Sequence, residues 1–331
     1  MTRPLRILTW HVHGNYLYYL SHAPHEFFLP VSPDRKHGHG GRGGTFPWRG
    51  NVHDVPADEV RSLDLDCILF QCRENHAEHQ HELLSPAQRR LPRIYLEHDP
   101  PRVHPTDTEH PVDDPDVLLV HVTEFNRLMW DSGRTPTRVI EHGVVIPEHA
   151  RYRGDIPRGL VVINNLRTRG RRLGADVFED LRGEVPLDLV GMDAESMGGL
   201  GEVSPPELPT FAAGYRFCFN PIRYTSLGLA VCEAMMIGMP IVGLATTEMV
   251  TVIENGVSGH LETNPRRLIG PMQELLRDPE RARAMGRRAR RAAMERFDIG
   301  RFARDWDEAF RLVAGGAIPT ASRLAPERVA S

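Results

Sequence analysis

The sequence contains almost no lysine and no long hydrophobic run. Lysine occurs once, at Lys36, so every other permanent cation is an arginine. Its 331 residues include 40 basic and 44 acidic side chains, for a formal charge of -4, and this balance gives no reason to expect binding to nucleic acid. No run reaches the roughly 18 apolar residues of a membrane span. We therefore expect a globular protein without a nucleic-acid partner.

Cysteine is also scarce. The four cysteines, at positions 67, 72, 218 and 232, do not follow a zinc-binding spacing, and two of them lie in apolar runs. The first ten residues lead straight into an apolar strand, without the hydrophobic stretch of about 7 to 15 residues that marks an export signal. These absences predict a cytoplasmic protein with reduced thiols.

Short apolar runs recur along the first half of the chain, with helix-like segments between them. Hydrophobic residues make up 40% of the sequence, an ordinary globular value, and the length predicts about two domains. The runs at 5–10, 27–31, 66–71, 93–96, 117–122 and 138–140 predict buried parallel strands. Helices are predicted over 76–84 and 124–132, and the histidines of the first helix, His76, His79 and His81, are expected to face solvent.

A second βα series follows a polar linker at 148–158. Its predicted strands are 159–164, 187–190, 216–220 and 240–244, its predicted helices are 174–181, 227–237 and 248–254, and a helical segment from 265 to 311 breaks near Asp278 and Asp298. This pattern predicts an α/β protein with two Rossmann-like, doubly wound lobes facing a cleft. We assign residues 1–150 to the N-terminal lobe, 151–314 to the C-terminal lobe and 315–331 to a flexible tail.

The segment from Asn220 to Gly259 is the most informative part of the second lobe. A strand ends at Asn220, and a helix is predicted to begin near Leu227 with Gly228 in its first turn. The free N–H groups and positive dipole end of such a helix suit a phosphate. Glu233, about one and a half turns further along, can reach groups beside the phosphate, such as ribose hydroxyls.

The segment contains the words LGL at 227–229, EAM at 233–235, GMPIV at 238–242 and IENGVSG at 253–259. With these words it resembles the donor-binding core of retaining GT-B glycosyltransferases of the family 4 type, the group 1 glycosyl transferases. The resemblance implies that Leu227, Gly228 and Leu229 bind the donor and that Glu233 binds the nucleotide ribose. Thr225 stands where the family has a glutamate that contacts the donor sugar, so it is a candidate catalytic position without a charge.

The family also places an arginine and a lysine after the first strand of this lobe, where they neutralise the diphosphate. In the segment INNLRTRGRRLGADVFEDL, Arg167 falls at the arginine position and Arg172 lies one residue before the lysine position. A guanidinium group binds two phosphate oxygens at once. Alternatively, the arginines of this segment form a solvated loop.

Two residues of the first lobe match family positions. Gly14 follows the first strand, where the family has a glycine-rich loop near the donor phosphates. His98, in IYLEHDPP, follows a buried strand where the family often carries a histidine near the transferred sugar. We expect His98 to contact sugar or acceptor as a catalytic residue, with a loop histidine bonded to backbone as the alternative.

The resemblance implies transfer of a hexosyl-type sugar from a nucleotide-sugar donor to a glycan, lipid-linked or small-molecule acceptor, with retention of configuration. The implied reaction requires no metal and no other cofactor, and no DxD metal motif stands in a suitable place in the sequence. A non-catalytic nucleotide-sugar binding protein is an alternative, because of Thr225. A second alternative is a metal-dependent hydrolase that uses His11 and His13, with further ligands from His98, His121 and His142.

One predicted helix is strongly basic. It carries arginines at positions 281, 283, 287, 288, 290, 291 and 296. Such a helix is a candidate for peripheral contact with anionic lipids at the inner face of the membrane. The alternative is a solvated helix face whose charges are offset by nearby carboxylates.

Overall fold

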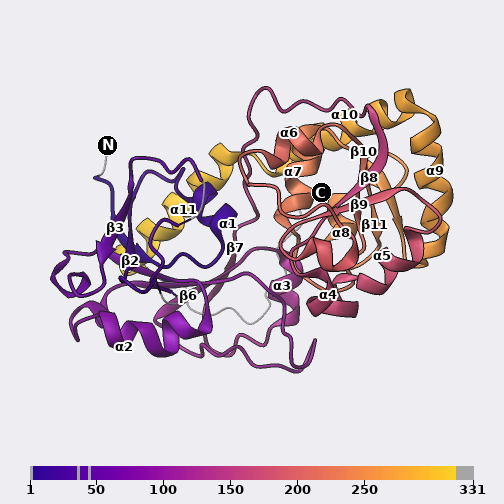
Figure 1. Cartoon of the computed structure of the whole chain (residues 1–331). Helices are drawn as coiled ribbons and strands as arrows, with labels where there is room; N and C mark the ends of the chain where they lie inside the picture. Colours follow the sequence, from indigo (N-terminus) through magenta and orange to yellow (C-terminus); the bar gives the residue numbers. More distant parts are fainter. Residues whose placement is uncertain (1–2, 36–37, 44–45, 318–331) are drawn as a thin grey trace, which may run out of the picture. The chain divides into compact units, whose positions relative to one another are not determined.

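The computed structural model describes residues 3–35, 38–43 and 46–317 (Figure 1). They form two compact units. Unit 1 contains the described residues up to Ile140, apart from 46–47, together with those from Ala303 onward, and unit 2 contains 46–47 and Glu141–Phe302. Residues 318–331, most of the predicted tail, lie outside the described part of the chain.

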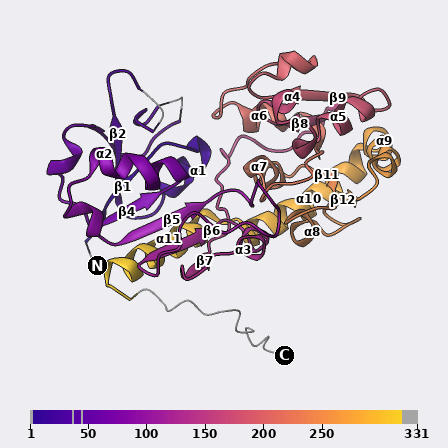
Figure 2. The same ribbon diagram turned by 90° about the horizontal axis from the view of Figure 1, so that it is seen from below.

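Unit 1 is built on a seven-stranded parallel sheet with the strand order β3-β2-β1-β4-β5-β6-β7, which Figure 2 shows from β2 to β7. The strands are β1 (Arg6–Thr9), β2 (Glu26–Val31), β3 (Val52–Pro56), β4 (Cys67–Phe70), β5 (Arg93–Glu97), β6 (Val117–His121) and β7 (Thr137–Val139). Six of them match the predicted apolar runs. The sequence pattern missed β3, an edge strand in which only Val52 and Val55 are buried.

Helices cover both faces of this sheet. They include α1 (Gly14–Leu20), α2 (Gln80–Leu83), α3 (Glu124–Met129) and the part of α11 (Ile299–Ala314) that follows Phe302. On one face, Phe310 of α11 packs against Phe27 with ring centroids 6.1 Å apart, and the Trp306 indole donates to the Tyr16 hydroxyl at 3.1 Å. The opposite face buries Leu8, Ile68 and Phe70 among other apolar side chains.

The helix predicted over 76–84 differs from the expectation in its histidines. A π-helical turn (Asn75–His79) precedes α2. His79 is buried instead of facing solvent, with its ring 6.5 Å from that of Trp10 and its Nδ1 3.1 Å from the Asn75 amide. The wider π turn and the adjoining Trp10 explain why a polar-looking segment places a histidine inside.

Unit 2 contains a five-stranded parallel sheet with the order β12-β11-β10-β8-β9. Its strands are β8 (Ile156–Val162), β9 (Leu187–Val190), β10 (Tyr215–Asn220), β11 (Ile241–Leu244) and β12 (Gly259–Glu262). Its helices are α4 (Leu166–Arg169), α5 (Ala175–Leu181), α6 (Leu208–Ala212), α7 (Leu229–Ile237), α8 (Met249–Val252), α9 (Ile269–Arg277) and α10 (Pro279–Arg296). The helical breaks predicted at Asp278 and Asp298 are confirmed, and the Asp278 side chain caps α10 by accepting from the Arg281 amide.

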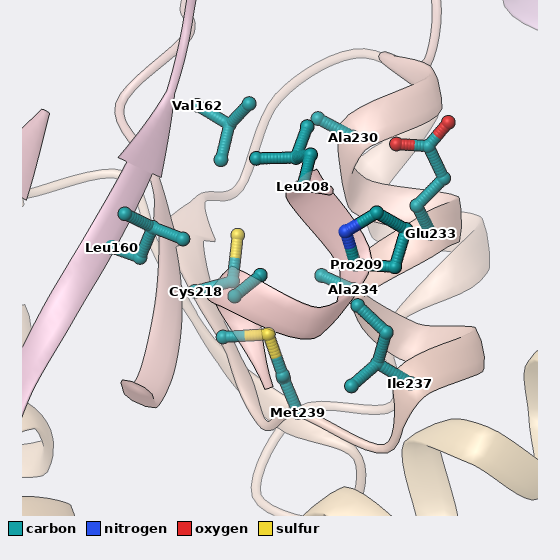
Figure 3. Close-up of a pocket in the computed structure, with 11 residues that line it drawn as sticks. Leu160, Val162, Leu208, Pro209, Cys218, Ala230, Glu233, Ala234, Ile237 and Met239 are labelled. Atoms are coloured by element: carbon teal, nitrogen blue, oxygen red, sulfur yellow. The ribbon is translucent and has the colours of Figure 1, made fainter. Parts of the chain in front are cut away.

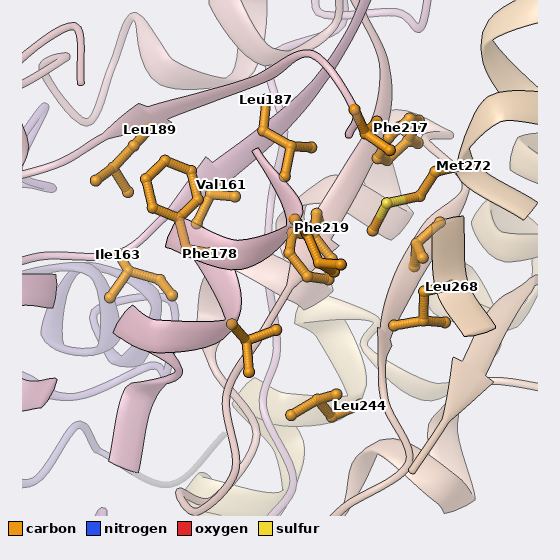
Figure 4. Close-up of a cluster of buried hydrophobic side chains, with 14 of the residues drawn as sticks. Val161, Ile163, Phe178, Leu187, Leu189, Phe217, Phe219, Leu244, Leu268 and Met272 are labelled. Atoms are coloured by element: carbon orange, nitrogen blue, oxygen red, sulfur yellow. The ribbon is translucent and has the colours of Figure 1, made fainter. Parts of the chain in front are cut away.

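The core of unit 2 follows from the alternation of side chains along its strands. Val161, Phe217 and Phe219 point to the face covered by α5 and α9, where they form one cluster with Phe178 and Met272 (Figure 4). The intervening residues, such as Leu160 and Cys218, face α6 and α7. Since both faces are covered, the strands contain runs of consecutive apolar residues, such as LVV in β8 and IVGL in β11, as expected for a parallel sheet.

Both sheets are doubly wound, which confirms the predicted fold class. In each sheet the order reverses beside the first strand, between β1 and β4 in unit 1 and between β8 and β10 in unit 2. Ligands of open α/β sheets bind at this switch point, outside the carboxyl ends of the strands. None of the helices in the described ranges is long and apolar enough to span a bilayer.

Candidate functional site

The loops that follow β8 and β10 meet at the switch point of unit 2. The backbone amides of Arg223 and Tyr224 donate to the Arg172 carbonyl at 3.0 and 3.2 Å. Gly174 allows this approach, because a Cβ there would lie 2.0 Å from the Pro221 carbonyl oxygen, and its φ of +84° favours glycine. Backbone contacts therefore hold the two loops together.

A carboxylate strengthens the same junction. Asp176, in the first turn of α5, accepts from the Arg223 guanidinium at 2.6 and 2.9 Å and from Arg171 at 2.6 Å. The hydrogen bond from Arg223 lowers the pKa of the Asp176 carboxyl below its ordinary value. Arg223 thus joins the loop after β10 to the connection between β8 and α5, and Arg171 shares the same carboxylate.

The two arginines predicted to bind the diphosphate lie on the connection between β8 and α5. Arg167 is exposed on α4, and its guanidinium donates to the Ser196 carbonyl in the segment after β9. Arg172 is half-buried in the turn Gly170–Leu173, and its carbonyl holds the loop after β10. Of the two, Arg172 has the backbone nearer to the predicted donor segment.

Helix α7 begins two residues later than predicted. Gly228 is its N-cap, with φ −68° and ψ 133°, so this extended residue precedes the first turn, which starts at Leu229. Leu227 is buried and anchors the helix start. A Cβ built on Gly228 would meet nothing within 4 Å, so the space beside this backbone is open. The Val231 N–H donates to the Gly228 carbonyl at 3.0 Å, whereas the N–H groups of Leu229 and Ala230 come too early in the helix for an intrahelical acceptor.

Glu233 lies on α7 and is 6% exposed. It borders a small apolar cavity together with Leu160, Cys218 and Met239, and Figure 3 shows its carboxylate pointing away from Cys218 and Met239. The cavity encloses only about 10 Å³, about the space for one water. It therefore belongs to the core beneath the helix, and a nucleotide would have to lie outside it.

Thr225 is half-buried in the loop after β10. The loop after β11 supports the residues around it, because the Thr246 hydroxyl donates to the Ile222 carbonyl at 3.0 Å and the Thr247 hydroxyl to the Ser226 carbonyl at 3.4 Å. Thr247 has a φ of +51°, which is strained for a β-branched residue. Sequence reasoning missed both threonines, since neither belongs to a recognised word.

In unit 1, the structure brings together the candidates at the ends of two strands. Gly14 opens α1, the first helix after β1, and His98 directly follows β5. The His98 ring lies 4.2 Å from that of His13 and 4.9 Å from that of Tyr16, measured between centroids. Since Gly14 follows His13, His98 lies near the segment that leads from β1 into α1.

Two histidines of the alternative metal site, His11 and His121, have surroundings that do not suit a metal ligand. A ring nitrogen of His11 lies 2.9 Å from the Gly41 carbonyl oxygen. His121 is fully buried, and burial lowers its pKa to about 3. Within the described residues, no three histidine, cysteine or carboxylate side chains are grouped to hold a metal ion. The hydrolase hypothesis built on His11 and His13 therefore has no ligand set there.

The basic helix is α10, and its arginines divide into two sets. Four are bound to neighbouring groups: Arg281 to Glu274, Arg283 to Glu280, Arg290 to the Met236 carbonyl, and Arg296 to Glu141 and Glu248. Arg287, Arg288 and Arg291 are exposed and have no ion pair within the described part of the chain. Met294 is exposed one turn further along.

Part of unit 2 matches a known protein family. Residues 183–278 match the model of the family described as Glycosyl transferases group 1. No curated protein matches the sequence. The family segment includes β10, α7 and β11, and so contains Thr225 and Glu233.

Several solved structures share the fold over almost the whole chain. Sucrose-phosphate synthase from Thermosynechococcus elongatus is 14% identical with a TM-score of 0.68, over 95% of this chain and 100% of that protein. Anabaena HepE in complex with UDP and glucose is 15% identical with a TM-score of 0.63, over 93% and 99%. AviGT4, a glycosyltransferase involved in avilamycin A biosynthesis, is 17% identical with a TM-score of 0.62, over 95% and 99%. The predicted resemblance to GT-B glycosyltransferases is confirmed.

Proposed function

Starting from a GT-B fold and a group 1 glycosyl transferase segment, we propose that the protein is a glycosyltransferase that moves a hexosyl-type sugar from a nucleotide-sugar donor with retention of configuration. The observation that carries the proposal is the junction at the switch point of unit 2. There the loop that bears Arg172 is bonded to the loop that leads into α7. A helix start of the kind that suits a phosphate and a loop that bears arginines are thus bonded to each other.

The donor is proposed to lie along this assembly. The N–H groups at the start of α7 and the guanidinium groups of Arg167 and Arg172 would bind the diphosphate and stabilise its charge as the sugar leaves. Glu233 would accept hydrogen bonds from the ribose. Anabaena HepE has been crystallised with UDP and with UDP-glucose, which supports a nucleotide-sugar donor on this fold.

Retention is proposed to occur without a base or a metal from the protein. A donor phosphate oxygen takes the proton of the acceptor hydroxyl as the new glycosidic bond forms on the face from which the nucleoside diphosphate departs. Thr225 would hydrogen-bond near the sugar without adding charge. Gly14 and His98, in unit 1, would contact donor phosphate and acceptor, where the acceptor is a glycan, a lipid-linked or a small-molecule compound.

The direct test combines binding and turnover. The purified protein is titrated calorimetrically with a panel of nucleoside diphosphates and then assayed for transfer and donor hydrolysis with the matching nucleotide sugars. Binding should weaken in Glu233→Gln, and in Gly228→Ala, whose Cβ would occupy the open space proposed for the ligand. If no nucleoside diphosphate binds and no sugar is transferred or released, the proposal is wrong.

The non-catalytic alternative is favoured by one observation, the neutral Thr225 at the sugar position. Tight nucleotide binding without transfer or hydrolysis, unchanged in Thr225→Glu, would establish that alternative. Turnover by the wild type would exclude it.

We propose a cytoplasmic location with contact at the inner face of the membrane through α10. The support is the exposed set of Arg287, Arg288 and Arg291, next to the 55% exposed Met294, because arginines beside an apolar side chain suit an anionic bilayer surface. Sedimentation with vesicles containing phosphatidylglycerol should fall at high salt and in the variant Arg287→Glu/Arg291→Glu. Sedimentation that neither change reduces, or none at all, would refute this contact.

A further inference from the structure

A buried histidine is bonded to the backbone at the start of α7. His142 is 4% exposed, and its Nε2 lies 2.8 Å from the Leu227 carbonyl oxygen, 85 residues further along the chain. A carbonyl oxygen can only accept, so this nitrogen carries the hydrogen and the ring is the Nε2–H tautomer. Burial lowers the pKa of His142 to about 4, so the ring is neutral at physiological pH.

The segment formed by Glu141 and His142 is itself held by two arginines. The Arg301 guanidinium donates to the carbonyls of Glu141 at 3.0 Å, of Arg296 at 2.9 Å, and of His142. Arg296 in turn donates to the Glu141 carboxylate at 2.9 Å and to Glu248 at 2.9 Å. These hydrogen bonds hold the segment that carries His142, whose ring binds the Leu227 carbonyl.

The orientation of one peptide plane connects this hydrogen bond with ligand binding. The Leu227 carbonyl and the Gly228 N–H belong to the same planar trans peptide and point in opposite directions. Since the carbonyl points toward the buried His142, the Gly228 N–H points away from it. Gly228 borders open space, where an added Cβ would have no neighbour within 4 Å.

We propose that His142 is a positioning residue that aims the Gly228 amide, and with it the first turn of α7, at the diphosphate of a bound nucleotide. This inference rests on the proposed donor site in unit 2. It assigns to His142 a role in phosphate binding through the Leu227 carbonyl, without contact between His142 and the ligand. Loss of the Nε2–H donor should therefore weaken binding of the phosphates and spare binding of the nucleoside.

The test compares two substitutions. His142→Leu keeps an apolar side chain of similar size but removes the donor, whereas His142→Gln can place an amide N–H near the position of Nε2. Affinities for the best-binding nucleoside diphosphate and for the corresponding nucleoside are measured by calorimetry, at a temperature where circular dichroism shows each variant folded. We expect His142→Leu to raise the Kd of the diphosphate at least ten-fold and that of the nucleoside less than two-fold, and His142→Gln to restore most of the loss.

His25→Leu is the matched control, because His25 is another buried histidine, in unit 1, with its Nδ1 bonded to the Leu5 amide at 3.2 Å. It should leave the diphosphate Kd unchanged. If His142→Leu binds the diphosphate like the wild type, or loses nucleoside and diphosphate affinity equally, the inference is wrong. If the wild type binds no nucleoside diphosphate, the proposed function fails and this inference fails with it.

A measurement on the unmodified protein makes the test independent of how the variants fold. Long-range ¹H–¹⁵N spectra should show the His142 ring in the Nε2–H form, with a proton that exchanges slowly. An Nδ1–H tautomer would mean that the bond to Leu227 does not exist, and would overturn the proposal even if nucleotides bind.

Discussion

Gly174 provides the sharpest test of how the two loops of unit 2 are joined. Its α-carbon approaches the loop after β10 so closely that an added Cβ would lie 2.0 Å from the Pro221 carbonyl oxygen, at a φ of +84°. An alanine at this position must adopt a left-handed backbone and also displace Pro221. We therefore expect Gly174→Ala to destabilise unit 2 through two separate effects.

The two effects can be given magnitudes. A left-handed backbone costs an L-residue about 1 to 2 kcal/mol. An ordinary contact needs about 3.4 Å, so the loop must yield by more than 1 Å, and overpacking of this kind costs about 1 to 3 kcal/mol. The sum of about 2 to 5 kcal/mol is a large part of a typical free energy of unfolding of about 5 to 15 kcal/mol.

Gly256→Ala separates the two contributions. Gly256 has nearly the same φ, +80°, but a Cβ there would meet nothing within 4 Å, so only the backbone cost of about 1 to 2 kcal/mol applies. Urea unfolding should be followed by far-ultraviolet circular dichroism. Tryptophan fluorescence would not report on unit 2, because all four tryptophans, at positions 10, 48, 130 and 306, belong to unit 1. Equal losses in the two variants would refute the proposed close approach at Pro221.

Three further predictions concern unit 2. Burial lowers the pKa of His142 from 6.5 to about 4, so at pH 5 the unfolded state binds a proton that the folded state does not. This group should therefore make the free energy of unfolding, measured in urea, about 2 kcal/mol smaller at pH 5 than at pH 7.5. His142→Gln should lack that pH-dependent contribution. Thr247→Asn should raise the free energy of unfolding by about 1 kcal/mol, since asparagine tolerates the φ of +51°, and a decrease would contradict strain at this position. In Gly286→Ala the new Cβ would lie 1.9 Å from the Gly238 carbonyl oxygen, so α10 must move away from the end of α7. The thermal midpoint of unfolding should fall by an amount equivalent to at least about 1 kcal/mol. An unchanged midpoint would refute that contact.

The strands that the sequence pattern missed have a common physical cause. β3 (VHDVP) and β12 (GHLE) each lie at one edge of their sheet. An edge strand has fewer neighbours and keeps polar side chains, so it lacks the continuous apolar run of a buried parallel strand. Strands with a continuous apolar run, such as CILF in β4 and VLLV in β6, were predicted for that reason.

The candidate site was predictable in part. The helix start near Gly228 and the position of Glu233 followed from local sequence, because they depend on neighbours within one segment. The bond between the Arg172 carbonyl and the loop after β10, and that between His142 and Leu227, join residues 50 or more positions apart. No local pattern carries such tertiary contacts, which is why His142 was considered only as a metal ligand in the sequence.

The hydrogen bonds from Arg301 to the carbonyls of Glu141 and His142 have a consequence for the architecture of unit 2. They tie its last residues to its first, so the chain enters and leaves this unit at neighbouring points. A short linker from Phe302 back to Glu141 would close the unit into a ring, and new ends could then be opened in a surface loop to give a circular permutant. A unit whose two ends lie close together can also be inserted as a module into one surface loop of a host protein.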